Sequence, residues 1–368
     1  MRTFVYNYFS QLVLLIISFS AFLSCSVQKE EDFYTVADFH KVPKIDAHFH
    51  YNTPDTRHLL YADSINMWFV SPNVDAGRSI DEQFEIASRI KREFGDKFFF
   101  LGTFPVDNFN DPDFTGGVIR RIDKAVESGA SGIKVWKNIG MELKDQNGNY
   151  VMIDDPAFHP VFEYLQENRI PLLGHLGEPL NCWLPAEEMT LGNDRRYFEN
   201  NPQYHMYLHP EAPSYEDQIN ARDRVLEQYP RLIFSGAHLA SLEWSTDELA
   251  TRFESYPGLK VDLSARIGHL QHQSLTDHER VRDFLIRYQD RIMYGSDMSV
   301  SEQSTNYSSV TAGLYRRWLD DWAYLATDSM IVVNDLDQQE VRGLQLPASV
   351  IDKIYFKNAE QFFITRHR

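Results

Sequence analysis

Short apolar runs, rich in β-branched and aromatic residues, alternate with amphipathic stretches from residue 44 to near the end of the chain. A short apolar run predicts a buried strand, and apolar residues spaced three and four apart predict a helix. Strands are expected at 44–49, 65–70, 98–104, 132–136, 170–174, 232–237, 259–264 and 291–295. Helices are expected between most of them, at 80–94, 113–128, 156–167, 215–228, 244–256 and 277–288.

This alternation of strands and helices predicts an α/β fold with a parallel sheet. Eight such units are what a (β/α)8 TIM barrel requires, so one barrel over residues 44–368 is the expected architecture. An open doubly wound sheet is the alternative, but no glycine-rich phosphate loop follows the first strand. We see no repeat beyond the βα unit and no second domain.

Two connections are much longer than the usual few residues. Residues 176–214 follow the fifth strand and are rich in Trp, Tyr, Pro and Asn, which suggests a lid over the barrel. Residues 298–344 follow the eighth strand and contain a helical pattern at 308–325. Both connections leave the carboxyl ends of their strands. They are therefore expected over the same face, where barrels of this kind place their active sites.

The first residues have the pattern of an export signal. Arg2 precedes apolar runs at 12–17 and 19–23, and Cys25 follows, so residues 1–24 are expected to be a signal peptide. Residues 22–25, Phe-Leu-Ser-Cys, resemble the bacterial lipoprotein box, in which the cysteine becomes the lipidated first residue, although Leu is usual where Phe22 stands. Plain secretion with cleavage nearby is the alternative.

The lipoprotein resemblance implies an exported protein held on the outer membrane by Cys25, with residues 25–43 as a tether. The acidic stretch at 28–32 is similar to a signal for the outer cell surface, or is simply a solvated charge run. We expect Cys25→Ser to release soluble protein, as measured by membrane fractionation. If the substituted protein stays with the membranes, the anchor lies elsewhere.

Composition narrows the functional classes. Asp and Glu number 53 against 36 Lys and Arg, so the net charge is -17, and no basic stripe is present for nucleic acid. The 25 Phe, 19 Tyr and 6 Trp predict a bulky core and an aromatic-lined cleft. Only one cysteine, Cys182, remains besides Cys25, so a lipidated Cys25 leaves no intrachain disulfide.

The first expected strand carries the sequence Lys-Ile-Asp-Ala-His-Phe-His at 44–50. Because side chains alternate along a strand, Asp46, His48 and His50 are expected on one face. Two imidazoles at this spacing can share one divalent ion, and the alternative is a hydrogen-bonded histidine pair. Asp46 either orients one of these histidines or is a buried carboxylate that accepts from backbone amides.

Three further metal-competent residues stand at the ends of other expected strands: His175, His238 and Asp297. In a barrel the carboxyl ends of the strands converge, so these side chains and the two histidines of the first strand are expected around one site. Imidazoles and a carboxylate leave a divalent ion with a net positive charge and an open position, which lowers the pKa of a bound water towards ~7. The sequence therefore predicts one divalent metal ion, with zinc expected and manganese or iron as alternatives.

At this point the chain resembles the amidohydrolase superfamily, in the branch that includes aminocarboxymuconate semialdehyde decarboxylase and related lactonases and hydrolases. The likeness covers about residues 44–368 and extends to a closing helix at 346–359. It implies a metal bound by His48, His50, His175 and Asp297, with Asp297 also the proton acceptor and His238 steering the water or the substrate. Trp136 stands where relatives often have His, which leaves the number of metal ions open.

Two cationic residues are weaker candidates. Lys134 could bind a substrate anion, or be carboxylated and bridge a second metal as in other superfamily branches, or simply reach solvent. Arg266 could clamp a substrate carboxylate, or pair with one of the many acids.

The expected function is a metal-dependent hydrolase that attacks an amide, lactone or ester carbonyl of a small organic substrate. The alternatives are a metal-dependent non-oxidative decarboxylase of the same superfamily and a non-catalytic surface binding protein. Whether the chain forms a homodimer is left open.

Overall fold

The computed structural model describes residues 32–365, so residues 1–31 and 366–368 lie outside the described part. The expected signal peptide and the proposed lipidation site, Cys25, are therefore outside the described residues, and the anchor stays a prediction. Within residues 32–365, no helix is both long and apolar enough to cross a membrane.

Eight parallel strands form the wall of a barrel in the described part of the chain. They are β1 (Lys44–Asp46), β3 (Met67–Pro72), β4 (Phe98–Leu101), β5 (Ile133–Val135), β6 (Leu172–Gly174), β7 (Phe234–Gly236), β8 (Lys260–Asp262) and β9 (Ile292–Met293). Their hydrogen-bonded order is β1-β3-β4 and then β5-β6-β7-β8-β9. Each strand overlaps one of the eight ranges expected from the sequence, because a strand buried on both faces has a continuous apolar run.

Two backbone seams close this wall. Between β4 and β5, the amide of Gly102 donates to the carbonyl of Gly132 at 2.9 Å, and Gly102 bridges to Ile133. Between β9 and β1, the amide of Ala47 donates to the carbonyl of Tyr294 at 2.9 Å. The last strand therefore meets the first, and the predicted (β/α)8 TIM barrel is confirmed.

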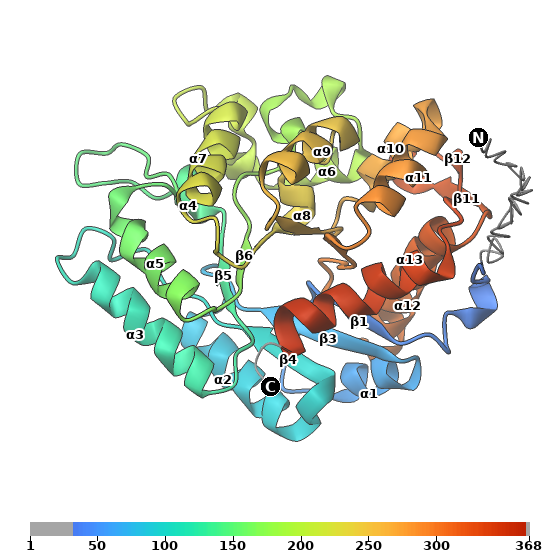
Figure 1. The fold of residues 1–368 in the computed structure, drawn as a ribbon, viewed down its shortest axis with the longest axis horizontal. Helices are drawn as coiled ribbons and strands as arrows, with labels where there is room; N and C mark the ends of the chain where they lie inside the picture. Colours follow the sequence, from blue (N-terminus) through green and yellow to red (C-terminus); the bar gives the residue numbers. More distant parts are fainter. Residues whose placement is uncertain (1–31, 366–368) are drawn as a thin grey trace, which may run out of the picture. The chain divides into compact units, whose positions relative to one another are not determined.

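Helices surround the strands, which lie at the centre of the molecule (Figure 1). The six expected between strands are α2 (Ile80–Phe94), α3 (Phe114–Glu127), α5 (His159–Glu167), α7 (Tyr215–Gln228), α9 (Thr246–Ser255) and α11 (His278–Arg287). Two of them, α2 and α7, begin and end at the expected residues. Each has a serine cap, Ser79 or Ser214, whose hydroxyl accepts from an amide of the first turn.

Several further helices lie in the described residues, among them the four-residue α4 (Asn138–Met141) and α8 (Ala237–Ala240). α1 (Arg57–Ser64) and α10 (Ile267–Thr276) were not expected, since their apolar periodicity is short. The expected closing helix at 346–359 is present as α13 (Ala348–Asp352), followed by further helical turns to Ile364. These turns bury Phe362 and Phe363 in an apolar cluster with barrel residues such as Ile45 and Leu101.

The first strand is shorter than expected. It ends at Asp46, and a separate strand, β2 (His50–Asn52), pairs in parallel with β10 (Ser299–Ser301). The Asp46 carboxylate accepts from the amides of His48 at 3.3 Å and Ser296 at 2.9 Å, which takes both amides out of the sheet. The break therefore lies inside the histidine motif.

Residues 32–43, expected as part of a tether, pack against the barrel. Phe39 is fully buried, the carbonyl of Thr35 accepts from the indole of Trp322 at 3.0 Å, and the carbonyl of Asp32 accepts from the amide of Ala348 at 2.7 Å. A short 3-10 turn lies at Val36–Asp38. Within the described residues the folded unit thus begins before residue 44, because aromatic side chains of this segment enter the core.

Both long connections are structured. Residues 176–214, which we call the lid, hold α6 (Gly192–Asn200) and four short 3-10 turns. Residues 298–344 hold β10, α12 (Tyr307–Ala326) and an antiparallel hairpin of β11 (Met330–Val333) and β12 (Gln339–Arg342). Arg196 of the lid pairs with Asp335 beside the hairpin at 2.6 Å, so the two connections meet as expected.

Candidate active site

A cavity of about 120 Å³ lies between the carboxyl ends of the barrel strands and the lid. We call it the central cavity. From the barrel side it is lined by Lys137, His175, His238, Ala265, Arg266 and Asp297. From the lid it is lined by Glu178, Pro179, Asn193, Asp194, Tyr197 and Phe198. Four of the residues predicted from the sequence thus line one cavity, at the barrel end where active sites of this architecture lie.

Among the described residues, two clusters of metal-competent atoms share His48: His48 with His50 and Asp297, and His48 with His238 and Asp262. Oδ1 of Asp297 lies 3.2 Å from Nε2 of His50 and 3.5 Å from Nε2 of His48. The strand pairing explains this approach, because β2 carries His50 beside β10, which follows Asp297 directly. Nδ1 of His50 faces the carbonyl oxygen of Pro72 at 3.2 Å, which leaves Nε2 directed at the cluster.

The backbone is unusual at two of the site residues. His238 and Asp297 each have a φ of 60°, in the left-handed region that non-glycine residues seldom adopt. His238 begins a run of four such residues in the turn after β7, which ends at Ser241. Each such residue costs roughly 1–2 kcal/mol, and such strain gathers at functional sites. The strain therefore marks the same strand ends that the sequence singles out.

His175 and His238 form a second pair beside this cluster. Their ring centroids are 4.3 Å apart, and the ring of His238 lies 4.9 Å from that of His48. Nδ1 of His238 lies 2.9 Å from the carbonyl oxygen of Ser264. Nε2 of His175 and Nε2 of His238 are both buried without a hydrogen-bond partner among the described residues. Buried polar atoms of this kind are rare unless a ligand, ion or water satisfies them.

The sequence analysis missed Asp262, the last residue of β8. Its Oδ2 lies 2.9 Å from Nδ1 of His48, and its Oδ1 accepts from the amides of His238 at 2.8 Å and Ser264 at 3.1 Å. A carboxylate on the far nitrogen of a histidine fixes the ring and its tautomer. Asp262 stands at the end of an apolar strand, the same signal that identified His175 and Asp297, so it could have been found.

Asp46 does not orient a histidine ring. Besides the two amides described above, its carboxylate accepts from the indole of Trp318 at 3.1 Å, and burial raises its pKa to about 7. Of the two roles left open by the sequence, the structure supports the buried carboxylate held by backbone amides.

Lys134, on β5, points into the barrel instead of reaching solvent. Its side chain is fully buried, and Nζ lies 3.3 Å from Nε2 of His48. Burial lowers its pKa to about 8, while the nearby Asp262 and Asp297 act in the opposite direction. Lys134 therefore reaches the histidine cluster from the interior of the barrel.

A second group missed from the sequence surrounds Glu178, which follows β6. Nζ of Lys137 pairs with its carboxylate and also donates to the hydroxyl of Tyr197 in the lid at 2.9 Å. Nη2 of Arg266 lies 3.7 Å from the same carboxylate. Arg266 thus both lines the central cavity and pairs with an acid. Glu178 stands three residues after His175, and nothing in a single sequence shows that its partners converge there.

The electrostatics of the site favour neutral imidazoles and an ionised Asp297. Burial is the largest cause that lowers the pKa of His48, and it lowers the pKa of His175 and His238 well below the usual range. Burial would raise the pKa of Asp297, but neighbouring imidazoles, His238 foremost, hold it well below its usual value. Neutral imidazole and carboxylate are the forms that bind a metal.

Comparison with known protein families shows to which family the chain belongs. A family model described as Amidohydrolase matches residues 45–364, which is most of the chain. The chain belongs to the amidohydrolase family. The family is one of metal-dependent enzymes, which agrees with the prediction from the histidine motif. No curated protein sequence matches it.

The chain is also similar to solved structures, at low identity. A 2,6-dihydroxybenzoate decarboxylase from Rhizobium is 15% identical, with 88% of this chain and 98% of that chain covered and a TM-score of 0.51. An uncharacterised TIM-barrel protein from Bordetella bronchiseptica is 13% identical, with 89% and 100% covered and a TM-score of 0.48. At this identity the first likeness supports the barrel fold alone.

The residues around His48 and Asp297 fit a divalent ion. Two imidazole nitrogens and a carboxylate oxygen lie within 4.8 Å of one another. Nε2 of the buried His175 forms no hydrogen bond with the described residues, and Oε2 of Glu178 lies 3.5 Å from it. Such a mixed nitrogen and oxygen donor set suits zinc, manganese or iron. His48, His50 and Asp297 would hold the ion. The ring of His238 lies 4.9 Å from that of His48, and His175 follows on the cavity wall, 4.3 Å from the ring of His238.

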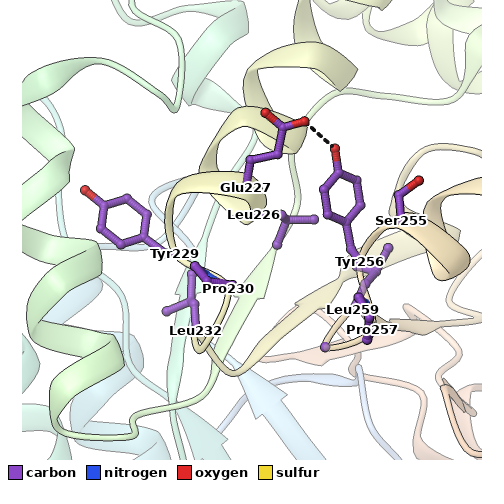
Figure 2. Close-up of a pocket in the computed structure, with 10 residues that line it drawn as sticks. Leu226, Glu227, Tyr229, Pro230, Leu232, Ser255, Tyr256, Pro257 and Leu259 are labelled. Carbon is purple, nitrogen blue, oxygen red and sulfur yellow. Dashed lines mark hydrogen bonds between the residues drawn. The ribbon is translucent and has the colours of Figure 1, made fainter.

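A larger cavity, of about 240 Å³, lies at the other end of the barrel (Figure 2). Its walls come from the segments just before β7 and β8, at the amino ends of these strands. It is lined mainly by apolar and tyrosine side chains, and its one drawn hydrogen bond joins Tyr256 to Glu227 at 3.1 Å. None of the predicted site residues lies there, so the smaller central cavity is the candidate active site.

Proposed function

We propose that this protein is a metal-dependent hydrolase that acts on an amide, lactone or ester carbonyl in an uncharged small organic substrate. The observation that carries the proposal is the pairing of charges in the central cavity. Lys137 and Arg266, its two cationic lining residues, both face the buried carboxylate of Glu178. Burial would lower the pKa of Arg266, but Asp194 and Glu243 raise it by adding negative charge nearby.

A substrate carboxylate would have to compete with these buried acids for the same cations. The cationic side chains that line the cavity are already paired, so only the bound ion would be left to balance a substrate carboxylate, and a buried charge is stable only when it is paired. An uncharged carbonyl compound needs no such partner. It could still accept a hydrogen bond from Nε of Arg266, which is buried and lacks a partner among the described residues. The same charge pairing disfavours a decarboxylase, whose substrate is an acid.

In this proposal His48, His50, His175 and Asp297 hold one divalent ion, with zinc expected. When bound, such an ion acts as a Lewis acid that polarises a carbonyl group and lowers the pKa of a water molecule. Asp262 holds the ring of His48 so that Nε2 faces the cluster, which preorganises the site. Lys134 contributes positive charge beneath His48, which offsets part of the charge of Asp262.

Asp297 and His238 carry the proton transfers and the orientation of the reactants. A water oxygen attacks the carbonyl carbon, and Asp297 accepts a proton from that water. The bond from this carbon to the leaving oxygen or nitrogen then breaks, and Asp297 returns the proton to the leaving group. Nδ1 of His238 donates to the carbonyl oxygen of Ser264, and a neutral ring has only one N–H, so its Nε2 is an acceptor. His238 therefore accepts a hydrogen bond from the attacking water through Nε2 and orients that water towards the carbonyl carbon.

The test uses matched pairs of lactones, esters and amides, neutral or bearing a carboxylate, together with a carbon dioxide assay on aromatic acids. We expect hydrolysis of neutral members at a kcat/KM at least about tenfold above that of their charged partners, and no carbon dioxide. The Glu178→Gln variant releases the cations, so its preference should move towards the charged partner by about tenfold or more, as one charge pair in a protein is worth several kcal/mol. The exposed lid variant Glu187→Gln is the control.

Release of carbon dioxide without hydrolysis would replace this proposal by the decarboxylase. If metal-loaded protein turns over neither the carbonyl compounds nor the aromatic acids, the result would instead favour a non-catalytic binding protein, the other alternative function expected from the sequence. A Glu178→Gln variant with unchanged preference would show that the charge pairing does not select the substrate.

A further inference from the structure

A second cavity adjoins the central cavity, and we propose that it binds an uncharged, polyhydroxylated part of the substrate. We call it the side cavity; its volume is about 120 Å³. Asn193 of the lid and Ala265 after β8 line both cavities, so the two spaces share a wall. The inference rests on the proposed hydrolase function, because it places the reacting carbonyl in the central cavity and a more distant part of the same molecule in the side cavity.

The walls of the side cavity come from both long connections and from α10. The lid contributes Leu191, α10 contributes Gly268 and Gln271, and the segment from β11 to Asp335 closes the far side. A Cβ at Gly268 would lie 3.1 Å from Cδ1 of Leu191, so α10 and the lid approach as closely as a glycine permits. The space is therefore bounded by packed elements on several sides.

Gln271 is the polar group that points to a ligand. It is 7% exposed and lines the side cavity, yet its amide has no hydrogen bond to any described residue. The amide faces the cavity and offers one acceptor and two donors to whatever fills the space. A hydroxyl group both donates and accepts, so hydroxyls on adjacent carbons suit this amide better than an ion of either sign.

The charged residues of the side cavity also argue for an uncharged ligand. Arg317 lies 3.9 Å from Asp321 and close to Asp320, so positive and negative charges face the space together. Asp321 in turn accepts from the hydroxyl of Tyr294 at 2.9 Å. Opposite them, Leu191, Ile331 and Val333 offer apolar surface. Polar edges with an apolar face match a sugar-like chain, whose hydroxyls lie at the rim and whose C–H groups lie on the faces.

The experiment compares D-glucono-1,5-lactone with δ-valerolactone, which share the ring ester but differ in their hydroxyl groups. We expect metal-loaded enzyme to prefer the hydroxylated lactone in kcat/KM. Gln271→Leu should lower that preference by about five- to tenfold, which is the worth of one or two neutral hydrogen bonds. Asp320→Ala, at an exposed position that tolerates substitution, should lower it in the same direction. The exposed Gln303→Leu, outside both cavities, should leave it unchanged.

Binding is measured separately by saturation-transfer NMR, with D-glucono-1,5-lactam and δ-valerolactam on the same metal-loaded proteins. Signals from the hydroxylated lactam that weaken in Gln271→Leu and Asp320→Ala would support the side cavity even if neither lactone is hydrolysed, in which case only the proposed reaction fails. The proposal that the side cavity is a subsite would be overturned if kcat/KM were equal for the two lactones, or if neither substitution changed the lactam signals.

Discussion

The Asp297→Asn variant is expected to keep most of its metal and to lose turnover by about 10²–10⁴-fold or more, the usual worth of general base catalysis. Asparagine keeps the size of the side chain and one oxygen towards His48 and His50, but it has no charge and almost no basicity. The backbone contact from the amide of residue 297 to the carbonyl of His48, at 2.9 Å, does not depend on the side chain. The fold should therefore survive.

Three measurements test this prediction: kcat, metal content by elemental analysis, and the melting temperature. The matched control is Asp328→Asn, the same change at an exposed aspartate outside the cavities, which should leave all three unchanged. If metal-loaded Asp297→Asn turned over at a near wild-type rate, Asp297 would be structural. His238 would then be the first residue to examine as the proton acceptor.

His48→Ala has the second large expected effect, the loss of bound metal and with it of activity. This variant removes one ligand atom and leaves Asp262 buried without its imidazole partner. Losing a partner of a buried pair costs about 3–5 kcal/mol, so a lower melting temperature is also expected. Wild-type protein should contain about one metal ion per chain after dialysis, and the variant at least tenfold less.

A less disruptive variant separates metal loss from unfolding. In the wild type, Nδ1 of His50 faces only the carbonyl oxygen of Pro72, so removing the ring leaves no buried charge without a partner. His50→Ala should therefore lose the metal with a smaller change in melting temperature. His40→Ala, at an exposed histidine outside the site, is the control. If both His48→Ala and His50→Ala kept one ion per folded chain, the metal centre would have to be sought elsewhere. About two ions in the wild type would instead implicate Lys134 as a bridging group.

The barrel and most of its helices could be predicted because each buried strand is a continuous apolar run and each covering helix has a regular apolar stripe. The break after Asp46 could not. The alternation at 44–50 fits an unbroken strand, and only the amides of His48 and Ser296, both captured by Asp46, show why it ends. The aromatic side chains at 34–39 likewise gave no periodic signal, so the folded unit begins earlier than expected.

The site residues that could be predicted from the sequence are those that residue type and position at a strand end identify by themselves. His48, His50 and Asp297 come together as expected, and His175 and His238 line the same space. The partners of these residues were harder. Glu178 matters because Lys137 and Arg266 converge on it from different loops, and Gln271 matters because nothing bonds to it. Both facts belong to three-dimensional packing and leave no pattern along the chain.

The seam between β9 and β1 also sets when the metal centre can exist. His48 and Asp297 sit where the first and last strands of the wall join, so nearly the whole folded unit must be synthesised before both ligands are available. Contacts between such distant segments form late in folding, because the chain must lose the entropy of closing a long loop before these contacts contribute favourable free energy. Binding free energy then becomes part of the stability of the finished barrel. The ion would thus be taken from whichever compartment the chain completes its folding in, and the metal supply of that compartment would decide which ion the enzyme carries.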